Sequence, residues 1–470
     1  MAKKYGARSP LSRRGFLRTS ASAAGAAGVA ASGLGSLIGC GGDDDVPMTT
    51  PDAGRRETQL RILGWTHFVP GHDVWFDTFA RAWGEANGVE VVVERVPFNM
   101  VRPTFMAEME SGTGHDLYEW PTPQADLEPH VVSLNDMMTE LEARHGTMIP
   151  LCRQSCFNPR TNNFYALNHG WAPDPANFRS SLWSGVGMPQ GPSSWQQLLE
   201  GGRQIKAAMN VHVGIGLAGT DPDANMACRA LLWSYGASVQ SANAEVVINS
   251  PQSIAAVEFM RELYADTMVP EVLAWGAADN NIALVEGRAS YIINSISAYR
   301  TAQANVPATA ADIFFGRALM GPATALVGAH ANVSMMVARH ARNPNAAQDF
   351  MLHLVEHYNE VVYNSALYNL PAFPSTTPQL TGDDGWLAQD PFESEPANKL
   401  SLLTDAESWS TNVGYPGAAN PAVGEVLASG IVPQMFLRAA NGEMTSEQAV
   451  QWAEDQIAPI YERWRAEGLI

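Results

Sequence analysis

Short apolar runs alternate with segments of helical periodicity over the first part of the chain beyond residue 58. The apolar runs predict strands at Leu60–Trp65, Val89–Val96 and Asp116–Trp120, of which Val89–Val96 is a β-branched run typical of a buried strand. Apolar residues at helical spacing predict helices over Asp73–Asn87 and Met100–Met109. An alternation of strand and helix of this kind indicates a parallel sheet covered by helices on both faces.

The rest of the chain is richer in helix, and several helix starts are marked by capping residues. Helices are predicted to begin after Ser194, after Ser250 and after Thr445, whose partner Gln448 completes a capping box. The pattern also predicts a long helix and two strands, in chain order Gly287–Asn294 (strand), Asn332–Ala338 (strand) and Pro344–Tyr363 (helix).

The first forty residues have the features of an export address rather than of a fold. Ser12-Arg13-Arg14-Gly15-Phe16-Leu17-Arg18 is a twin-arginine signal, and Leu37-Ile38-Gly39-Cys40 resembles a bacterial lipobox with Cys40 as the lipidated residue. We therefore expect residues 1–39 to be a signal and 40–58 a lipid-anchored, flexible tether, with the protein periplasmic or at the cell surface. An uncleaved transmembrane helix is the alternative, but the uncharged stretch 19–39 is rich in weakly inserting Ala, Gly and Ser.

Charge and cysteine content narrow the classes of partner. Cleavage before Cys40 leaves 431 of the 470 residues and, with six basic residues removed, changes the net charge from −19 to −25. This charge excludes nucleic acid as a partner and disfavours docking on anionic lipid headgroups. Cys152, Cys156 and Cys228 remain; outside the cytoplasm Cys152 and Cys156 could form a disulfide.

The order of several short motifs resembles a known family, the maltose-binding type of extracytoplasmic solute-binding proteins that serve sugar-importing ABC transporters. The resemblance covers roughly residues 58–467 and rests on Arg61–Trp65, Glu110–Tyr118, Pro192–Leu198, Asn249–Pro270, Ala283–Tyr291 and Asn441–Glu443 with Ser446 and Ala449. The chain departs from the family pattern at His115, where proline is common, and over His169–Trp183.

The resemblance implies an α/β, periplasmic-binding-protein-like fold of two doubly wound lobes with a hinge and an interlobe cleft. The expected lobes are 59–168 with 300–330 (N-terminal) and 169–299 with 331–470 (C-terminal). It also implies a monomeric, non-enzymatic binding component without a cofactor, which captures a sugar or oligosaccharide and delivers it to ABC transporter permease subunits.

Sugars are recognised by hydroxyl-bonding side chains and by aromatic rings that stack on their C–H faces. Such side chains follow the predicted strands or lie at the predicted lobe crossings. The candidate ligand-binding residues are Trp65, His67, Trp120, Gln124, His169, Trp171, Asn225, Ser297, Tyr299, His330 and Tyr415. Each of them could instead pack within a lobe, and tryptophans at helical spacing are expected in the core.

Two alternatives remain open at this point. The first is a zinc metallopeptidase, because His353-Leu354-Val355-Glu356-His357 matches the H-x-x-E-H motif on a predicted helix. The second is a binding protein for a polyamine or another cationic solute, which carboxylates such as Asp116 and Glu119 near Trp120 would recognise together with aromatic rings.

Overall fold

The computed structural model describes residues 59–122, 124–219 and 221–470, so the predicted export signal, Cys40 and the tether lie outside the described residues. Residues 59–470 form one compact unit. In this described part, no helix has both the length and the apolar character needed to cross a membrane.

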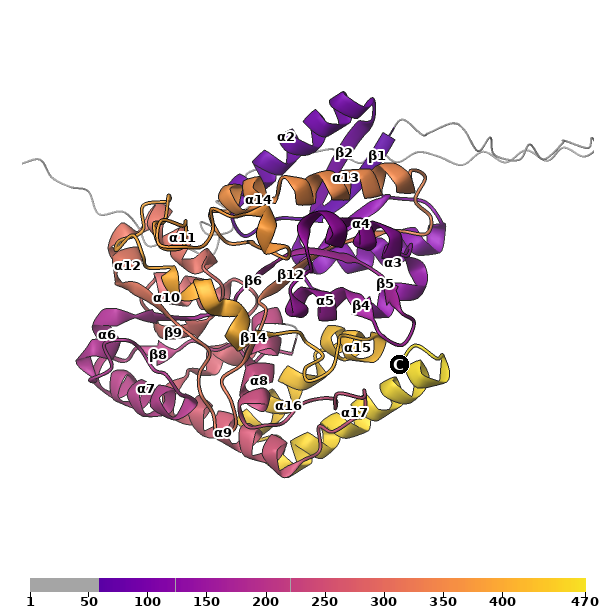
Figure 1. The fold of residues 1–470 in the computed structure, drawn as a ribbon. Coiled ribbons are helices and arrows are strands. Elements are labelled where there is room, and N and C mark those ends of the chain that lie inside the picture. Colours follow the sequence, from indigo (N-terminus) through magenta and orange to yellow (C-terminus); the bar gives the residue numbers. More distant parts are fainter. Residues whose placement is uncertain (1–58, 123, 220) are drawn as a thin grey trace, which may run out of the picture. The chain divides into compact units, whose positions relative to one another are not determined.

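The larger sheet is six-stranded and carries the N-terminal strands (Figure 1). Its order is β13 (Leu370–Pro371), β6 (Leu167–Ala172), β12 (Ala331–Val337), β3 (Leu117–Trp120), β1 (Gln59–Trp65) and β2 (Glu90–Val96). Strands β2, β1 and β3 are parallel, whereas β12 runs antiparallel to both β3 and β6. The sheet is therefore mixed, whereas the local pattern predicted a parallel one. Strand β12 comes from far along the chain, and its direction cannot be predicted from local sequence.

Strand β2 lies at the edge of this sheet, and its side chains are half-buried or exposed, in contrast to the buried run that its β-branched residues predicted. Helices cover the sheet, among them α2 (Pro70–Asn87), α3 (Val101–Ser111) and α4 (Asn135–His145). Helix α2 ends as predicted, with Gly88 in the left-handed conformation at φ 68°.

The long helix predicted over Pro344–Tyr363 is two helices in the structure, α13 (Pro344–Glu356) and α14 (Tyr358–Asn364). They meet at His357, whose φ of −110° and ψ of 26° are not helical. Helix α13 packs on β12 and α14 packs on α2, so each half follows a different surface of the lobe. Apolar periodicity continues through the junction, which explains why the break was missed.

The smaller sheet has four strands, ordered β10 (Ile313–Gly316), β7 (Ala176–Arg179), β9 (Ala289–Ile293) and β8 (His212–Val213). We call the six-stranded sheet with its helices the N-terminal lobe and the four-stranded sheet with its helices the C-terminal lobe. The strand pairing differs from the expected bounds for four strands. Strand β13 and most of β6 lie in the ranges expected for the C-terminal lobe but belong to the six-stranded sheet, and β10 and β12 are also misplaced. Strand β10 was expected in the N-terminal lobe but pairs with β7, and β12 was expected in the C-terminal lobe but pairs with β3. Local pattern identifies a strand without identifying its partner.

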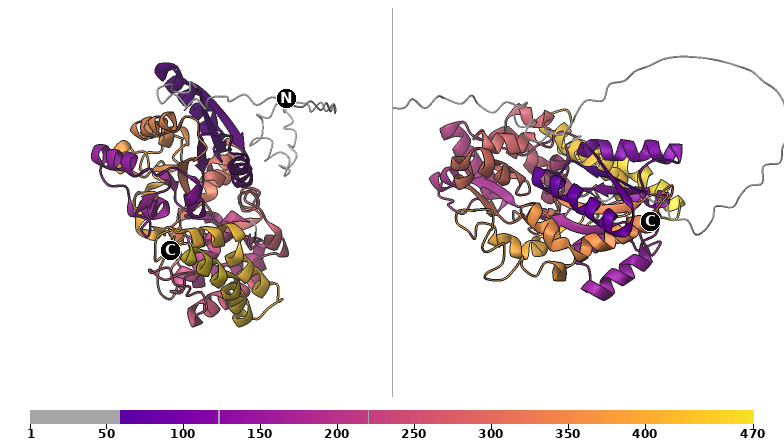
Figure 2. Two further views of the ribbon diagram at one scale, coloured as in Figure 1. Left: turned by 90° about the vertical axis from the view of Figure 1, so that its right-hand side faces the viewer. Right: turned by 90° about the horizontal axis from the view of Figure 1, so that it is seen from above.

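The C-terminal lobe confirms the predicted helix starts. Ser194, Ser250 and Thr445 cap their helices with side-chain oxygens, and the Thr445–Gln448 capping box is complete. The helices of this half are α6 (Ser180–Gly185), α7 (Trp195–Met209), α8 (Pro222–Ser234), α9 (Pro251–Thr267), α10 (Asp279–Val285), α11 (Ser297–Asn305), α12 (Pro307–Asp312), α15 (Pro421–Ser429), α16 (Ile431–Ala440) and α17 (Ser446–Ala466). Figures 1 and 2 show α2 and α13 at the end of the molecule opposite to α9, α16 and α17.

Smaller elements complete the fold. Helix α5 (Pro150–Cys156) precedes the hairpin of β4 (Phe157–Asn158) and β5 (Asn163–Phe164), and β11 (Val327–Gly328) pairs with β14 (Ser410–Thr411). Cys152 and Cys156, both on α5, are buried free thiols rather than a disulfide, as is Cys228. Burial raises the pKa of Cys156 to about 12, so this thiol stays protonated.

The chain crosses between the lobes at neighbouring points. One crossing, residues 173–175, joins β6 to β7, and another, residues 329–330, joins β11 to β12. The two lie side by side, since the backbone N–H of His330 donates at 2.9 Å to the carbonyl of Ala172, the last residue of β6 before the first crossing. These crossings hold the lobes at a common pivot.

Candidate functional site

A cavity of about 210 Å³ lies between the lobes. The N-terminal lobe contributes the end of β3, the residues after it and the start of α3, and the C-terminal lobe contributes the start of α8 and one side of α15. Its lining residues are Phe98, Asn99, Arg102, Trp120, Pro121, Thr122, Gln124, Gly219, Asp221, Pro222, Asn225, Met226, Gly424, Leu427 and Ala428. Clefts at the carboxyl ends of strands are the usual ligand sites of α/β folds.

Trp120 forms an aromatic part of the N-terminal wall, as its place at the end of a strand predicted. Its indole packs against the ring of Phe105 at 5.6 Å, and the residue is 2% exposed. The indole N–H has no hydrogen-bond partner among the described residues. A buried indole N–H usually finds an acceptor, so this donor is unusual in having none.

Polar side chains continue the same wall. Gln124 donates from Nε2 to the hydroxyl of Thr122 at 3.1 Å and accepts from Arg102 at 2.8 Å. Arg102 also forms an ion pair with Asp126. The positive charge of Arg102 is therefore compensated within the lobe, and the wall offers oriented amide and hydroxyl groups.

The opposite wall is the start of α8. Asp221 caps this helix by accepting from the N–H of Asp223 at 3.1 Å, and Pro222 occupies the first turn. Asn225 lies inside the helix, where its amide donates to the carbonyl of Leu427 at 3.0 Å and its carbonyl accepts from Arg229 at 2.9 Å. Asn225 thus links α8 to α15 at the cavity wall.

Burial raises the pKa of both carboxyls at this wall. Desolvation, followed by the charge of Asp223, raises the pKa of Asp221 to about 8. Desolvation also raises the pKa of Asp223 to about 6, although hydrogen bonds from Asn280 and Asn294, both 2.8 Å, favour its charged form. At neutral pH, Asp221 can therefore donate a hydrogen bond as well as accept one.

Three further predicted residues, Trp65, His67 and His330, lie together outside the lining. With Phe68 and Tyr368 they form a group of rings that we call the aromatic cluster. Trp65 lies 5.1 Å from Phe68, and His67 lies 5.0 Å from Tyr368, measured between ring centroids. His330 is 6.4 Å from Phe68 and 6.3 Å from Tyr368. Burial lowers the pKa of His67 to about 3, so this ring is neutral.

His330 of the aromatic cluster interacts electrostatically with carboxyl groups at the cavity wall. Burial lowers the pKa of His330, but Asp174 first, and then Asp223 and Asp221, raise it to a net value above the ordinary one. Since Asp221 lines the cavity, the cluster lies within reach of the same charges.

The structure places the other five predicted residues away from the cavity lining. His169 accompanies Glu119 and Tyr358 inside the N-terminal lobe, and Glu119 and Trp120 point to opposite faces of the sheet as successive strand residues. Trp171 is buried within β6. Ser297 bonds Asn281 and Asn294, Tyr299 donates to Ser394, and the ring of Tyr415 contacts that of Trp233 at 5.9 Å.

Some lining residues were not among the predicted ones. Asn99 lies in the 3₁₀ turn Phe98–Met100 before α3 and Arg102 in the first turn of α3, and no sequence signal distinguishes them from other polar residues of this region. Asp221 had a signal, because Asp221-Pro222 is a helix-start pattern, and helix starts converge on the clefts of α/β folds.

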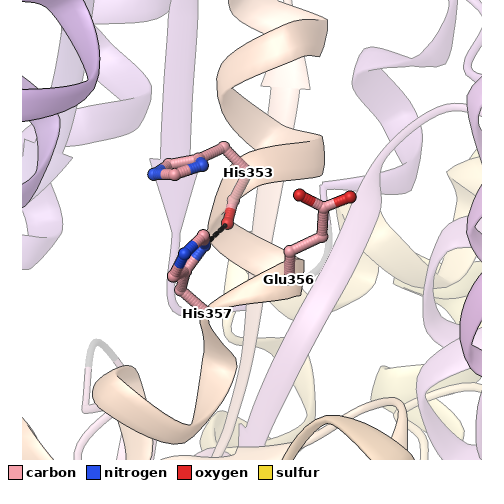
Figure 3. Close-up of side chains that lie close together, drawn as sticks. All are labelled: His353, Glu356 and His357. Atoms are coloured by element: carbon pink, nitrogen blue, oxygen red, sulfur yellow. Dashed lines mark hydrogen bonds between the residues drawn. The ribbon is translucent and has the colours of Figure 1, made fainter. Parts of the chain in front are cut away.

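The H-x-x-E-H residues lie together on α13 and at its end (Figure 3). Catalytic zinc sites use three protein ligands and a water. The cluster found among the described residues contains only His353, Glu356 and His357, so a catalytic role for Glu356 as base would leave two protein ligands. Glu356 is moreover paired with Arg144. This arrangement does not fit a metallopeptidase.

Comparison with known proteins agrees with this geometry. Residues 77–391 match the sequence profile of a family described as bacterial extracellular solute-binding protein. Proteins of Brucella abortus (strain 2308) and Brucella suis biovar 1 that are named as binding proteins are 20% identical over 230 residues. The match covers 47% of this chain and 54% of theirs, so the chain spans about half the length of these relatives.

Solved structures show the same fold. A sugar transporter protein of Arthrobacter chlorophenolicus A6 with bound laminaribiose has 17% identity and a TM-score of 0.70, covering 85% of this chain and 99% of its own. Maltose-bound T. maritima MalE3 has 16% identity, the same coverages and a TM-score of 0.70. A ribitol complex from Agrobacterium radiobacter K84 has 14% identity and a TM-score of 0.68, covering 86% and 98%. The predicted fold class, two α/β lobes of periplasmic-binding-protein type, is confirmed, with mixed sheets.

Proposed function

Because the chain belongs to the bacterial extracellular solute-binding protein family, we propose that its solute is a sugar or oligosaccharide, bound in the cavity between the lobes. The chain is a non-catalytic binding component of transport. Closure of the lobes on the solute would give the membrane partner a distinct state to recognise.

The observation that carries the sugar assignment is the place of Trp120 in the lining of a cavity that also carries the polar side chains of Thr122, Gln124 and Asn225. The aromatic face suits the C–H surface of a sugar, and the unpartnered indole N–H suits a hydroxyl. Laminaribiose, maltose and ribitol are bound by proteins that share this fold, which supports the same ligand class here.

The cationic alternative requires ionised carboxylates at the cavity. The raised pKa of Asp221 keeps that group protonated at neutral pH, and the carboxylate of Asp126 is already paired with Arg102, another lining residue. The lack of a free carboxylate at these two positions favours a neutral polyol or saccharide over a polyamine.

We assign the direct ligand contacts to Trp120, Gln124 and Asn225, which line the cavity. Trp65, His67 and His330, in the aromatic cluster, are buried outside the lining, and the solute would contact them only if the lobes open. For His169, Trp171, Ser297, Tyr299 and Tyr415, positions outside the lining support a packing role instead.

The partner and location extend the same proposal. The family is extracellular, and the twin-arginine signal with Cys40 supports export in the folded state followed by lipid anchoring. A lipid-held monomer would stay close to the permease subunits of an ABC importer, to which it delivers its solute.

Thermal unfolding of the full chain against a panel of saccharides, polyols and polyamines tests this function. A bound solute raises the melting temperature in proportion to RT ln(1 + [L]/Kd). We expect stabilisation by a saccharide or polyol, reduced in Thr122→Ala and unchanged in Thr139→Ala, a threonine on the surface of α4. Stabilisation by polyamines alone would overturn the sugar assignment.

A further inference from the structure

Helix α13 ends in two histidines one helical turn apart. His353 and His357 are four residues apart, a spacing that brings side chains together on one helix face. Their ring centroids are 4.1 Å apart, and Figure 3 shows the two imidazoles one above the other, beside the α13 ribbon. One ligand atom from each of His353, Glu356 and His357 falls within 4.8 Å of the others.

Both rings are oriented by their surroundings. His357 lies 2.8 Å through Nδ1 from the carbonyl oxygen of His353, and only a protonated nitrogen can donate to that oxygen. The Nε2 lone pair of His357 is therefore left for another partner. The His353 ring is stacked on Phe79 of α2 at 4.9 Å with an interplanar angle of 21°, which fixes its plane.

Carboxylates complete the surroundings. Glu356 is 37% exposed and is paired with Arg144, which also pairs with Glu140. If Glu356 turned to another partner, Arg144 would still be neutralised by Glu140. Glu360, which accepts from the indole of Trp75 at 3.3 Å, adds a second negative charge within one turn of His357.

We propose that His353, His357 and the carboxylate of Glu356 form a binding site for a first-row transition metal ion, with Zn²⁺ as its representative. Two imidazoles and a carboxylate are ligands that this ion accepts in tetrahedral sites, where the fourth position can be a water. Ligand atoms about 2 Å from zinc lie roughly 3.4 Å from one another in a tetrahedron. The three ligand atoms lie within 4.8 Å of one another, so binding an ion would require side-chain rotations that bring them closer.

This site is separate from the proposed solute cavity. The metal ligands belong to α13 and its junction with α14, whereas the cavity is lined by β3, α3, α8 and α15. Figure 1 shows α13 and α14 in the upper part of the molecule, below α2 and above α8 and α15. A bound ion would clamp the non-helical junction at His357 and so stabilise this outer layer without entering the cleft.

Calorimetric titration of the untagged full chain with ZnCl₂ tests the proposal. We expect one equivalent to bind, with the affinity reduced at least tenfold in both His353→Ala and His357→Ala and several-fold in Glu356→Gln. His130→Ala removes a half-buried histidine of the 3₁₀ helix Ala125–His130 and should leave zinc binding unchanged. Unfolding in metal-free buffer checks that each variant is folded, and Co²⁺ substitution should give the visible absorption of a tetrahedral site.

Wild-type zinc affinity in both histidine variants would overturn the site, and wild-type affinity in Glu356→Gln would overturn the assignment of that ligand. Solute affinity measured with and without saturating Zn²⁺ separates this proposal from the solute function. Equal affinities are expected, whereas competition between zinc and the solute would place the ion in the cavity and contradict the site on α13.

Discussion

His330 and Asp174 form an ion pair across two neighbouring chain crossings between the lobes, with Nδ1 of His330 3.1 Å from the carboxylate of Asp174. Their side chains are 6% and 2% exposed. Because each residue lies in a different crossing, the pair ties together the two segments about which the lobes would rotate. A buried ion pair that loses one partner leaves an uncompensated charge, so this contact should be sensitive to substitution and to pH.

Replacing His330 by glutamine should destabilise the protein more at low pH than at high pH. Asp174 raises the pKa of His330 above the ordinary 6.5. The stability that this charge contributes is fully present below pH 6.5 and is lost as pH rises through the raised pKa. We expect His330→Gln to lower the free energy of unfolding by about 2 kcal/mol at pH 6 and by clearly less at pH 9. Urea unfolding at both pH values measures this, and an equal loss at both would contradict the ion pair.

Replacing Asp221 by asparagine should show a pH dependence of the same sign, because the pKa of this group is also raised in the folded state. The pKa of Asp221 is raised to about 8 in the folded state, so folding favours the protonated form and wild-type stability falls as pH rises from about 4 to about 8. Asparagine cannot ionise and is an equally good helix cap. Relative to wild type, Asp221→Asn should gain about 1–3 kcal/mol between pH 5 and pH 8. The difference in melting temperature at the two pH values checks this, and a pH-independent difference would show that Asp221 is ionised throughout.

Gly170 has no room for a side chain. A Cβ atom at this position would lie 1.6 Å from the hydroxyl of Tyr358 and 2.8 Å from the carbonyl oxygen of Leu370, both in the N-terminal lobe. We expect Gly170→Ala to lower the free energy of unfolding by about 3 kcal/mol or more, since overpacking displaces a buried tyrosine. Gly185→Ala is the matched control, because nothing lies within 4 Å of its Cβ position. Chemical denaturation measures the stability of both variants. Similar stabilities would contradict the prediction, because they would mean that Tyr358 moves aside without cost.

Local signals accounted for much of the fold. The cap residues Ser194 and Thr445 were predictable because a capping side chain bonds backbone only a few residues away. The partner of β12 was not, since its antiparallel pairing with β3 joins Ser334 to Trp120 across a long stretch of chain. The break at His357 was missed because the apolar periodicity passes through it.

The candidate site divides in the same way. Trp120 could be predicted because a strand end is visible in the sequence and such ends gather at one edge of a sheet. Tyr299 shows the opposite case, since its hydroxyl donates to Ser394, on a loop whose path no local pattern reveals. Asn99 and Arg102 join the cavity only through the way that the lobes face each other.

The most direct test of the account is the affinity of the best saccharide for Trp120→Phe, measured by titration calorimetry beside Trp452→Phe. Phenylalanine retains an apolar ring against Phe105 but removes the indole N–H, which has no partner among the described residues, whereas Trp452 is a half-buried residue of α17. Losing one hydrogen bond and part of a stacking surface costs about 1.4 kcal/mol, which corresponds to about a tenfold change in Kd. The account predicts binding weakened about tenfold in Trp120→Phe and unchanged in Trp452→Phe. Wild-type affinity in a folded Trp120→Phe protein would contradict the placement of the sugar in this cavity.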